Sequence, residues 1–169
     1  MQLPIATERT MITTVSPADL AAYEALITIP EVADGAGFNL LSNQAMLSEV
    51  AKGQLKHPGT FGVRMDGRLI GSILLFDKVS RSGLPDSKNL EVSYFLHPDF
   101  WRKGIMTEAL TQLMTALQAD GKIRSISAEV FVDNVGSIAL LERVGFSRVA
   151  KIVDPIVGKP KLIYHLSFD

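Results

Sequence analysis

A short charged turn between a predicted strand and a predicted helix has the residues needed to bind phosphate. The turn, Trp101–Thr107, contains Arg102 and Lys103 and has Gly104 at its centre. A helix N-terminus offers several unpaired backbone N–H groups and about half a positive charge, which attracts anions. We therefore expect this turn to bind a phosphate-bearing cofactor.

The elements around the turn follow from the spacing of apolar residues. Apolar side chains recur at helical spacing from Gly104 until Gly121 ends the helix, and Asp66-Gly67 between two apolar runs predicts a hairpin. The expected elements, in chain order, are a strand over 8–15, a helix over 17–27, a loop over 30–41, a helix after Ser42, strands over 60–65 and 68–77, a loop over 78–89, a strand over 90–96, a helix from Gly104, a strand over 125–132, a helix over 134–143 and strands over 146–153 and 161–168. This order predicts an α/β or α+β fold, in which a mixed sheet carries helices on its faces.

Composition narrows the functional classes. The chain has 169 residues, of which 47% are hydrophobic, so it is long enough for one domain with a core. A net charge of −1 argues against nucleic acid as the main partner. The absence of cysteine excludes disulfides, thiolate metal sites and a cysteine nucleophile.

Location and metal content follow from further sequence features. The longest apolar stretch, residues 69–76, is too short for a membrane span, and the N-terminus lacks the blocks of a signal peptide. We therefore expect a cytoplasmic protein with no membrane partner. The histidines, His57, His97 and His165, are too dispersed in the sequence to suggest a metal site.

Several blocks resemble one known family. They are Thr7-Glu8-Arg9, residues 69–73, residues 91–101, Lys103-Gly104 with residues 107–110, and residues 134–146. The last block is the most specific, with an Asn-x-x-Ser helix start followed by a Glu-x-x-Gly-Phe exit. On these residues the chain resembles the GNAT superfamily of N-acetyltransferases. Its closest resemblance is to the branch that acetylates the N-terminal serine or alanine of ribosomal proteins.

The phosphate turn departs from the usual pattern of that superfamily. The usual loop is Gln/Arg-x-x-Gly-x-Gly/Ala, and these places fall on Trp101, Gly104 and Met106. The related branch usually has Trp-Gly-Lys-Gly, whereas this chain has Arg102 at the first glycine. Because the backbone N–H of Met106 remains, phosphate binding by the main chain is compatible with the change.

The resemblance implies a fold and a cofactor. The implied fold is a single domain over residues 1–169, with a mixed, mostly antiparallel sheet of about seven strands, helices on both faces and a splayed pair of central strands. The implied cosubstrate is acetyl-CoA, with no metal. The residues implied to bind it are Phe95 and Leu96 at the thioester, Arg102, Lys103, Gly104, Ile105, Met106 and Thr107 at the phosphates, and Asn134 at the pantetheine arm. Asn134 is also a good helix cap without any ligand.

Acetyl transfer to an amine requires the amine to lose a proton, and N-terminal amines have a pKa of about 8 against about 10.4 for lysine. Glu91 is the candidate to accept that proton, directly or through water, although it is also compatible with an exposed strand residue paired with a lysine. Ser137 is the candidate to donate a proton to the sulfur of coenzyme A, although it is also compatible with a residue that bonds only backbone. Tyr94 and Tyr164 are reserve acids.

We expect an acetyl-CoA-dependent N-acetyltransferase in which the amine attacks the thioester directly in a ternary complex. The expected acceptor is a protein or peptide N-terminus, with a small-molecule amine as the alternative. A non-catalytic acyl-CoA sensor would have the same phosphate turn. The early helices and the segments 30–41 and 78–89 are expected to contact the acceptor, and the chain is expected to be a monomer or homodimer.

Overall fold

The computed structural model describes residues 1–38 and 43–168, and their elements fall into two units. The N-terminal unit contains residues 2–74 and 94–113. The C-terminal unit contains Met1 and residues 75–93 and 114–168. Three elements pass through both units, and they are β4 (Arg68–Val79), β5 (Pro85–Leu96) and α4 (Ile105–Asp120).

The sheet of the N-terminal unit has the strand order β1-β2-β3-β4-β5. Its first three strands are β1 (Ile5–Ala6), β2 (Met11–Thr14) and β3 (Thr60–Met65). The hairpin predicted between β3 and β4 is confirmed, because Asp66 and Gly67 have φ angles of 49° and 78°. Two successive residues with positive φ are what a tight turn needs to match the twist of its strands.

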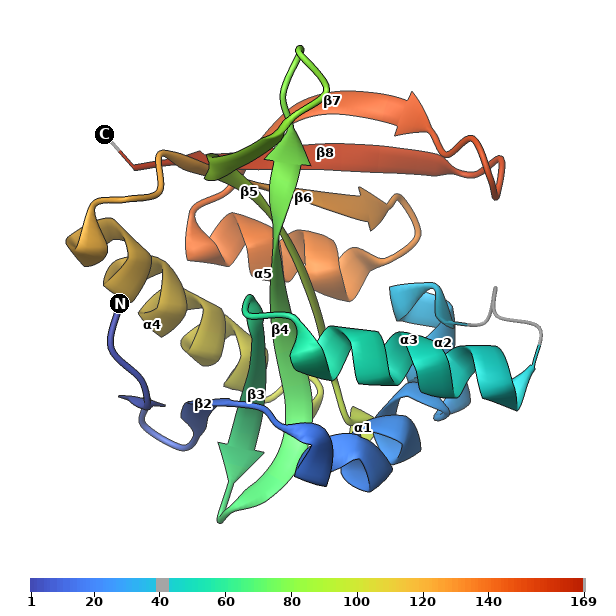
Figure 1. Cartoon of the computed structure of the whole chain (residues 1–169). Helices are drawn as coiled ribbons and strands as arrows, with labels where there is room; N and C mark the ends of the chain where they lie inside the picture. Colours follow the sequence, from blue (N-terminus) through green and yellow to red (C-terminus); the bar gives the residue numbers. More distant parts are fainter. Residues whose placement is uncertain (39–42, 169) are drawn as a thin grey trace. The chain divides into compact units, whose positions relative to one another are not determined.

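The helices of this unit are η1 (Pro17–Asp19), α1 (Leu20–Ile27), α2 (Pro30–Ala36) and α3 (Gln44–Lys56), and α1 packs beside both α2 and α3 (Figure 1). The predicted helix start is confirmed: the Ser16 hydroxyl accepts from the Ala18 N–H, and the Asp19 carboxylate accepts from the Ser16 N–H. The helix expected after Ser42 begins at Gln44, with Asn43 as its cap, and Ser42 itself lies outside the described residues.

The loop expected over 30–41 is wrong for its first part, which is helix α2. Pro30 occupies the first turn, Gly37 ends the helix with a φ of 81°, and Val32 is buried. Proline at the start and glycine just past the end are both helix signals, and together they outweigh the glycine inside the segment. Residues 39–41 lie outside the described residues.

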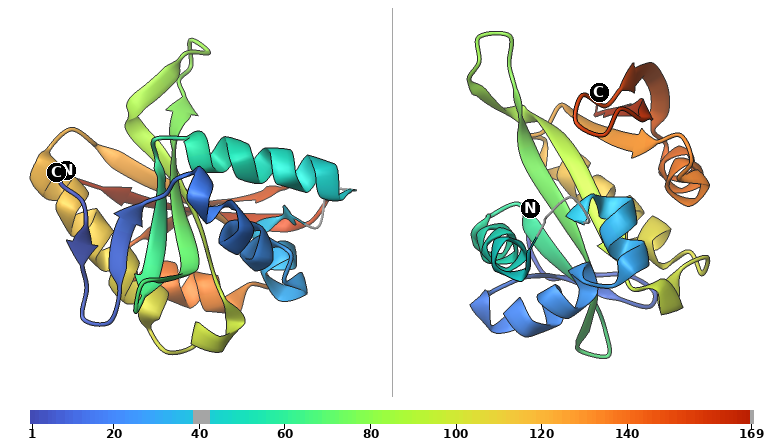
Figure 2. Two further views of the ribbon diagram at one scale, coloured as in Figure 1. Left: turned by 60° about the horizontal axis from the view of Figure 1, so that its bottom comes forward. Right: turned by 90° about the vertical axis from the view of Figure 1, so that its right-hand side faces the viewer.

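The C-terminal unit has the strand order β4-β5-β6-β8-β7, with β6 (Ser125–Phe131), β7 (Ser147–Val153) and β8 (Pro160–Ser167). β6 runs parallel to β5 for only three residue pairs, from Asn89–Ser125 to Glu91–Ser127, and runs antiparallel to β8 over its full length. Helix α5 (Val135–Val144) lies beside β6 and β8 (Figures 1 and 2). The described sheet therefore has eight strands rather than about seven, and the mixed, mostly antiparallel fold is confirmed.

The loop expected over 78–89 is shorter than the sequence indicates. β4 continues to Val79 and β5 begins at Pro85, so that only residues 80–84 connect them. The Ser80 N–H donates to the Leu84 carbonyl at 2.9 Å, which closes this turn. The residues of this hairpin are mostly polar, so its sequence lacks the alternation of apolar and polar residues that predicts a strand. The two strands pair all the same, because backbone hydrogen bonds between antiparallel strands do not need buried side chains.

Candidate active site

The predicted phosphate turn has a row of unpaired N–H groups in the N-terminal unit. Arg102 and Gly104 have φ angles of 59° and 74°, which turn the backbone sharply before α4. The first helical bond runs from the Glu108 N–H to the Gly104 carbonyl at 2.9 Å. The backbone N–H groups of residues 102–107 donate to no described residue. Left-handed residues followed by a helix N-terminus form a concave set of donors suited to an anion.

The two charged side chains of the turn, Lys103 and Arg102, differ in their contacts. Lys103 folds back, and its Nζ donates to the Asp99 carbonyl at 2.7 Å. Arg102 is exposed and holds a left-handed conformation that costs a non-glycine residue roughly 1–2 kcal/mol. That conformation explains why glycine suits this position. Met106 is buried, so its part at the surface of the turn is limited to its backbone.

The end of β5 orients backbone groups in two directions. The His97 N–H donates to the Ile70 carbonyl at 2.8 Å, and the Phe95 carbonyl lies 2.5 Å from where a Cβ on Gly71 would be. Both residues thus face β4, and Leu96 between them turns its N–H and carbonyl away from β4. The Leu96 carbonyl accepts from the Trp101 indole at 2.7 Å.

The side chain of Phe95 is buried in an aromatic cluster. It packs edge to face against Tyr23 and Phe38, with ring centroids 5.4 and 5.7 Å apart. Edge-to-face aromatic pairs add to the stability gained by burial. The end of β5 is therefore held by packing on one side and by the Trp101 hydrogen bond on the other.

In the C-terminal unit, Glu91 is half-buried on β5 and pairs across the sheet with Ser127. Burial raises the pKa of the Glu91 carboxyl, and the nearby Glu129 raises it further. Lys78 and Lys161 oppose this shift without cancelling it. Lys78 donates its hydrogen bond to Ser127 at 3.0 Å. A carboxyl group whose pKa is raised toward neutrality is suited to accept a proton.

The start of α5 contains Asn134 and Ser137. The Asn134 side-chain oxygen accepts from the Ser137 N–H at 3.1 Å, which confirms its role as a helix cap. Ser137 is half-buried in the first turn of the helix. Tyr164 on β8 is almost fully buried, and its hydroxyl donates to Glu142 at 2.8 Å. Burial raises the pKa of the Tyr164 hydroxyl. Tyr94, the other reserve acid, is half-buried on β5.

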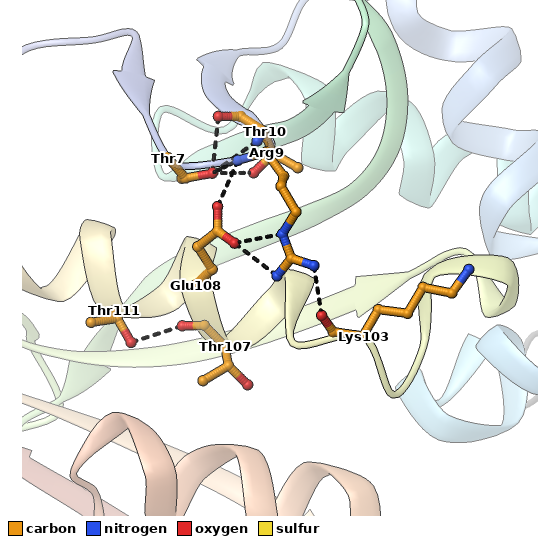
Figure 3. Close-up of polar contacts among 7 residues, drawn as sticks. All are labelled: Thr7, Arg9, Thr10, Lys103, Thr107, Glu108 and Thr111. Atoms are coloured by element: carbon orange, nitrogen blue, oxygen red, sulfur yellow. Dashed lines mark hydrogen bonds and ion pairs between the residues drawn. The ribbon is translucent and has the colours of Figure 1, made fainter.

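Sequence reasoning did not place Arg9 and Glu108 at the site, and the structure puts them against the phosphate turn (Figure 3). Both residues lie in sequence blocks that resemble the GNAT superfamily, and this resemblance could have drawn attention to them. Over residues 1–38 and 43–168, no three His, Asp or Glu side chains gather as metal ligands would. No helix in the same ranges is long and apolar enough to cross a membrane.

The chain is similar to a known protein family. The family described as "Acetyltransferase (GNAT) domain" matches residues 9–147. A probable N-acetyltransferase, YjcK of Bacillus subtilis strain 168, is 36% identical over 92 residues, which is 54% of this chain. The match covers 48% of YjcK, so the chain spans about half the length of this curated relative.

Solved structures show the same fold at low sequence identity. A GNAT-family acetyltransferase from Bacillus anthracis has a TM-score of 0.81 and 17% identity, with 98% of this chain and 99% of that chain covered. RimL, a ribosomal L7/L12 α-N-protein acetyltransferase in complex with coenzyme A, has a TM-score of 0.80 and 18% identity, with coverage of 98% and 97%. AAC(6')-Ib in complex with paromomycin and acetyl-CoA has a TM-score of 0.78 and 15% identity, with coverage of 95% and 94%. The family match covers most of the chain, and the chain therefore belongs to the GNAT acetyltransferase domain family.

Proposed function

We propose that this protein is an acetyl-CoA-dependent N-acetyltransferase that acetylates a primary amine. The observation that carries this proposal is the run of unpaired N–H groups at residues 102–107, on the N-terminal side of α4. Family membership supports the same function. A diphosphate has several anionic oxygens close together, and this turn offers a matching set of neutral donors at the positive end of a helix.

The N-terminal unit is proposed to bind the cosubstrate. The N–H groups of residues 102–107 and the Thr107 hydroxyl donate to the diphosphate. Acetyl-CoA supplies the thioester carbonyl that the amine attacks. The Leu96 N–H, which faces away from β4, donates to the thioester oxygen, and one such donor is typically worth about 3 kcal/mol. Phe95 is proposed to contribute by fixing the end of β5 through its packing.

The C-terminal unit is proposed to move protons. Glu91 accepts the proton of the attacking amine, directly or through a water molecule. Its raised pKa and its half-buried position on β5 support that role. The Ser137 hydroxyl passes a proton to the departing sulfur and takes one back from solvent, so that it acts as a relay. Asn134 holds the first turn of α5 in place while its amide contacts the pantetheine arm.

A protein or peptide N-terminus is the proposed acceptor. The pKa of an N-terminal amine, about 8, is closer to neutral than the value of about 10.4 for lysine, so less work is needed to deprotonate it. Similarity to RimL favours this acceptor, while similarity to AAC(6')-Ib favours a small-molecule amine as the second candidate. A monomer or homodimer acting in the cytoplasm remains our expectation.

Release of free coenzyme A from acetyl-CoA tests the proposal. The assay uses a panel of N-terminal peptides and small amines, and it compares the wild-type protein with Glu91→Gln. We expect turnover with at least one acceptor, a 10²- to 10⁴-fold lower kcat for Glu91→Gln, and unchanged affinity for coenzyme A. Binding of acetyl-CoA without turnover on any acceptor would identify a sensor instead of an enzyme. Equal rates for Glu91→Gln would exclude Glu91 as the base.

A further inference from the structure

We infer that Arg9 is a positioning residue for the phosphate turn, and that with Glu108 it forms a clamp that keeps the N–H groups of residues 102–107 available to an anion. This inference rests on the proposed binding of coenzyme A at that turn. The clamp consists of Arg9, Glu108 and the Lys103 carbonyl, and all three lie in the N-terminal unit (Figure 3).

The contacts of the clamp leave the guanidinium with little freedom. Arg9 Nε and Nη2 both lie 2.9 Å from Glu108 Oε2, and the Arg9 backbone N–H donates to Oε1 at 2.8 Å. The remaining nitrogen, Nη1, donates to the Lys103 carbonyl at 2.8 Å. Charge-assisted contacts of this kind are shorter and stronger than neutral ones and fix orientation. One arginine thus ties the N-terminal segment to both α4 and the turn.

The Lys103 carbonyl is the atom that makes the clamp relevant to binding. It lies four residues before Thr107, which is the position that would accept the Thr107 N–H if the helix continued backward. The Lys103 carbonyl does not accept the Thr107 N–H; it accepts from Arg9 Nη1 instead, and the Thr107 N–H stays unpaired. The Thr107 hydroxyl also points away from the guanidinium (Figure 3). The carbonyl is thereby held at the back of the turn while the N–H groups remain free.

The clamp also offsets a charge that would oppose binding. Glu108 lies in the first turn of α4, where a carboxylate stabilises the helix but repels a bound anion. Burial raises its pKa, yet hydrogen bonds from Thr7 and Arg9 lower the pKa overall, so Glu108 is ionised at neutral pH. Arg9 is the cation in contact with it. Without Arg9, the turn would also face an uncompensated carboxylate.

Calorimetric titration of coenzyme A into the full chain tests the clamp. The variants are Arg9→Gln, Arg9→Lys, Glu108→Gln and the double variant Arg9→Gln/Glu108→Gln. Arg64→Gln is the matched control, because Arg64 forms a similar 2.7 Å contact with Asp19 in the same unit and its Nε donates to Thr13 rather than to the turn. For each variant, the melting temperature and kcat/KM with S-acetyl-pantetheine, which lacks the diphosphate, are also measured.

We expect Arg9→Gln to raise the Kd for coenzyme A at least 10-fold and to leave kcat/KM with S-acetyl-pantetheine within 2-fold. The double variant regains part of the affinity because the uncompensated charge is gone, and Arg64→Gln keeps the wild-type Kd. Arg9→Lys keeps the positive charge but lacks the several N–H donors of the guanidinium, so we expect an intermediate Kd. This variant replaces Arg9→Gln in the test if Arg9→Gln does not fold.

An unchanged Kd for a folded Arg9→Gln, or an equal loss with both acyl donors, would overturn the clamp while leaving the proposed function intact. Failure of the wild-type chain to bind coenzyme A would instead overturn the proposed function, and the clamp with it.

Discussion

Gly71 on β4 lies against the end of β5, and Gly71→Ala tests how tightly that strand end is held. A Cβ at Gly71 would lie 2.5 Å from the Phe95 carbonyl oxygen and 3.2 Å from the Leu96 Cα. Both neighbours are backbone atoms, which cannot rotate away as the end of a side chain can. To restore even a 3.0 Å contact, β5 must move away from β4 by about 0.5 Å.

Overpacking of this kind typically costs about 1–3 kcal/mol. For a chain of this length each kcal/mol lowers Tm by about 2–4 °C, so we expect Gly71→Ala to lower Tm by roughly 2–12 °C. The shift also displaces the Leu96 N–H, which we propose donates to the thioester oxygen. Because a 1 Å error in positioning can cost about 10²-fold in rate, we expect about a 10-fold loss of kcat.

Two other glycines provide graded controls for thermal unfolding and coenzyme A release. Gly62→Ala meets first the Leu69 Cδ1 at 2.8 Å, the end of a flexible side chain, and is expected to cost less than Gly71→Ala. Gly53→Ala, in helix α3, meets nothing within 4 Å and is expected to stabilise by about 0.5–1 kcal/mol. A Gly71→Ala protein with wild-type Tm and kcat would refute the tight contact between β4 and β5.

Two further predictions concern proton transfer. If Glu91 is the base, as we propose, it acts only when ionised, and activity is lost as the pH falls through its raised pKa. Lys78→Met is then expected to raise that pKa further and to move the acidic limb of the kcat/KM profile to higher pH. Glu129→Gln is expected to lower the pKa and to move the same limb to lower pH. Limbs that do not move, or move the other way, would contradict the assignment of Glu91. Ser137→Ala is expected to lower kcat without changing Tm, whereas Asn134→Ala, which removes a helix cap, is expected to cost about 1 kcal/mol of stability. A matching loss of Tm in Ser137→Ala would show that its role is structural.

Local signals in the sequence were enough to predict most elements, including the turn before α4 that we propose binds phosphate. Asp66-Gly67 fixes a hairpin within four residues, and Gly104 with the apolar spacing after it fixes the start of α4. Helix α2 was missed although Pro30 and Gly37 mark its ends, because its interior contains only one buried residue and so has no apolar stripe.

Contacts between distant segments could not be predicted in this way. Arg9 and Glu108 are 99 positions apart, and no spacing rule relates them. The direction of the Leu96 N–H depends on the register between β4 and β5, because a shift of one residue would turn it toward β4. The pKa of Glu91 depends on Lys78, Glu129 and Lys161, which come from three different strands. These features can be seen only in the folded structure, where the distant segments meet.

The most direct test is a crystal structure of the protein grown with coenzyme A. We expect diphosphate oxygens within about 3 Å of the backbone N–H groups of residues 102–107, with the Arg9–Glu108 contact unbroken. Coenzyme A bound at another place, with those N–H groups facing only solvent, would contradict this expectation.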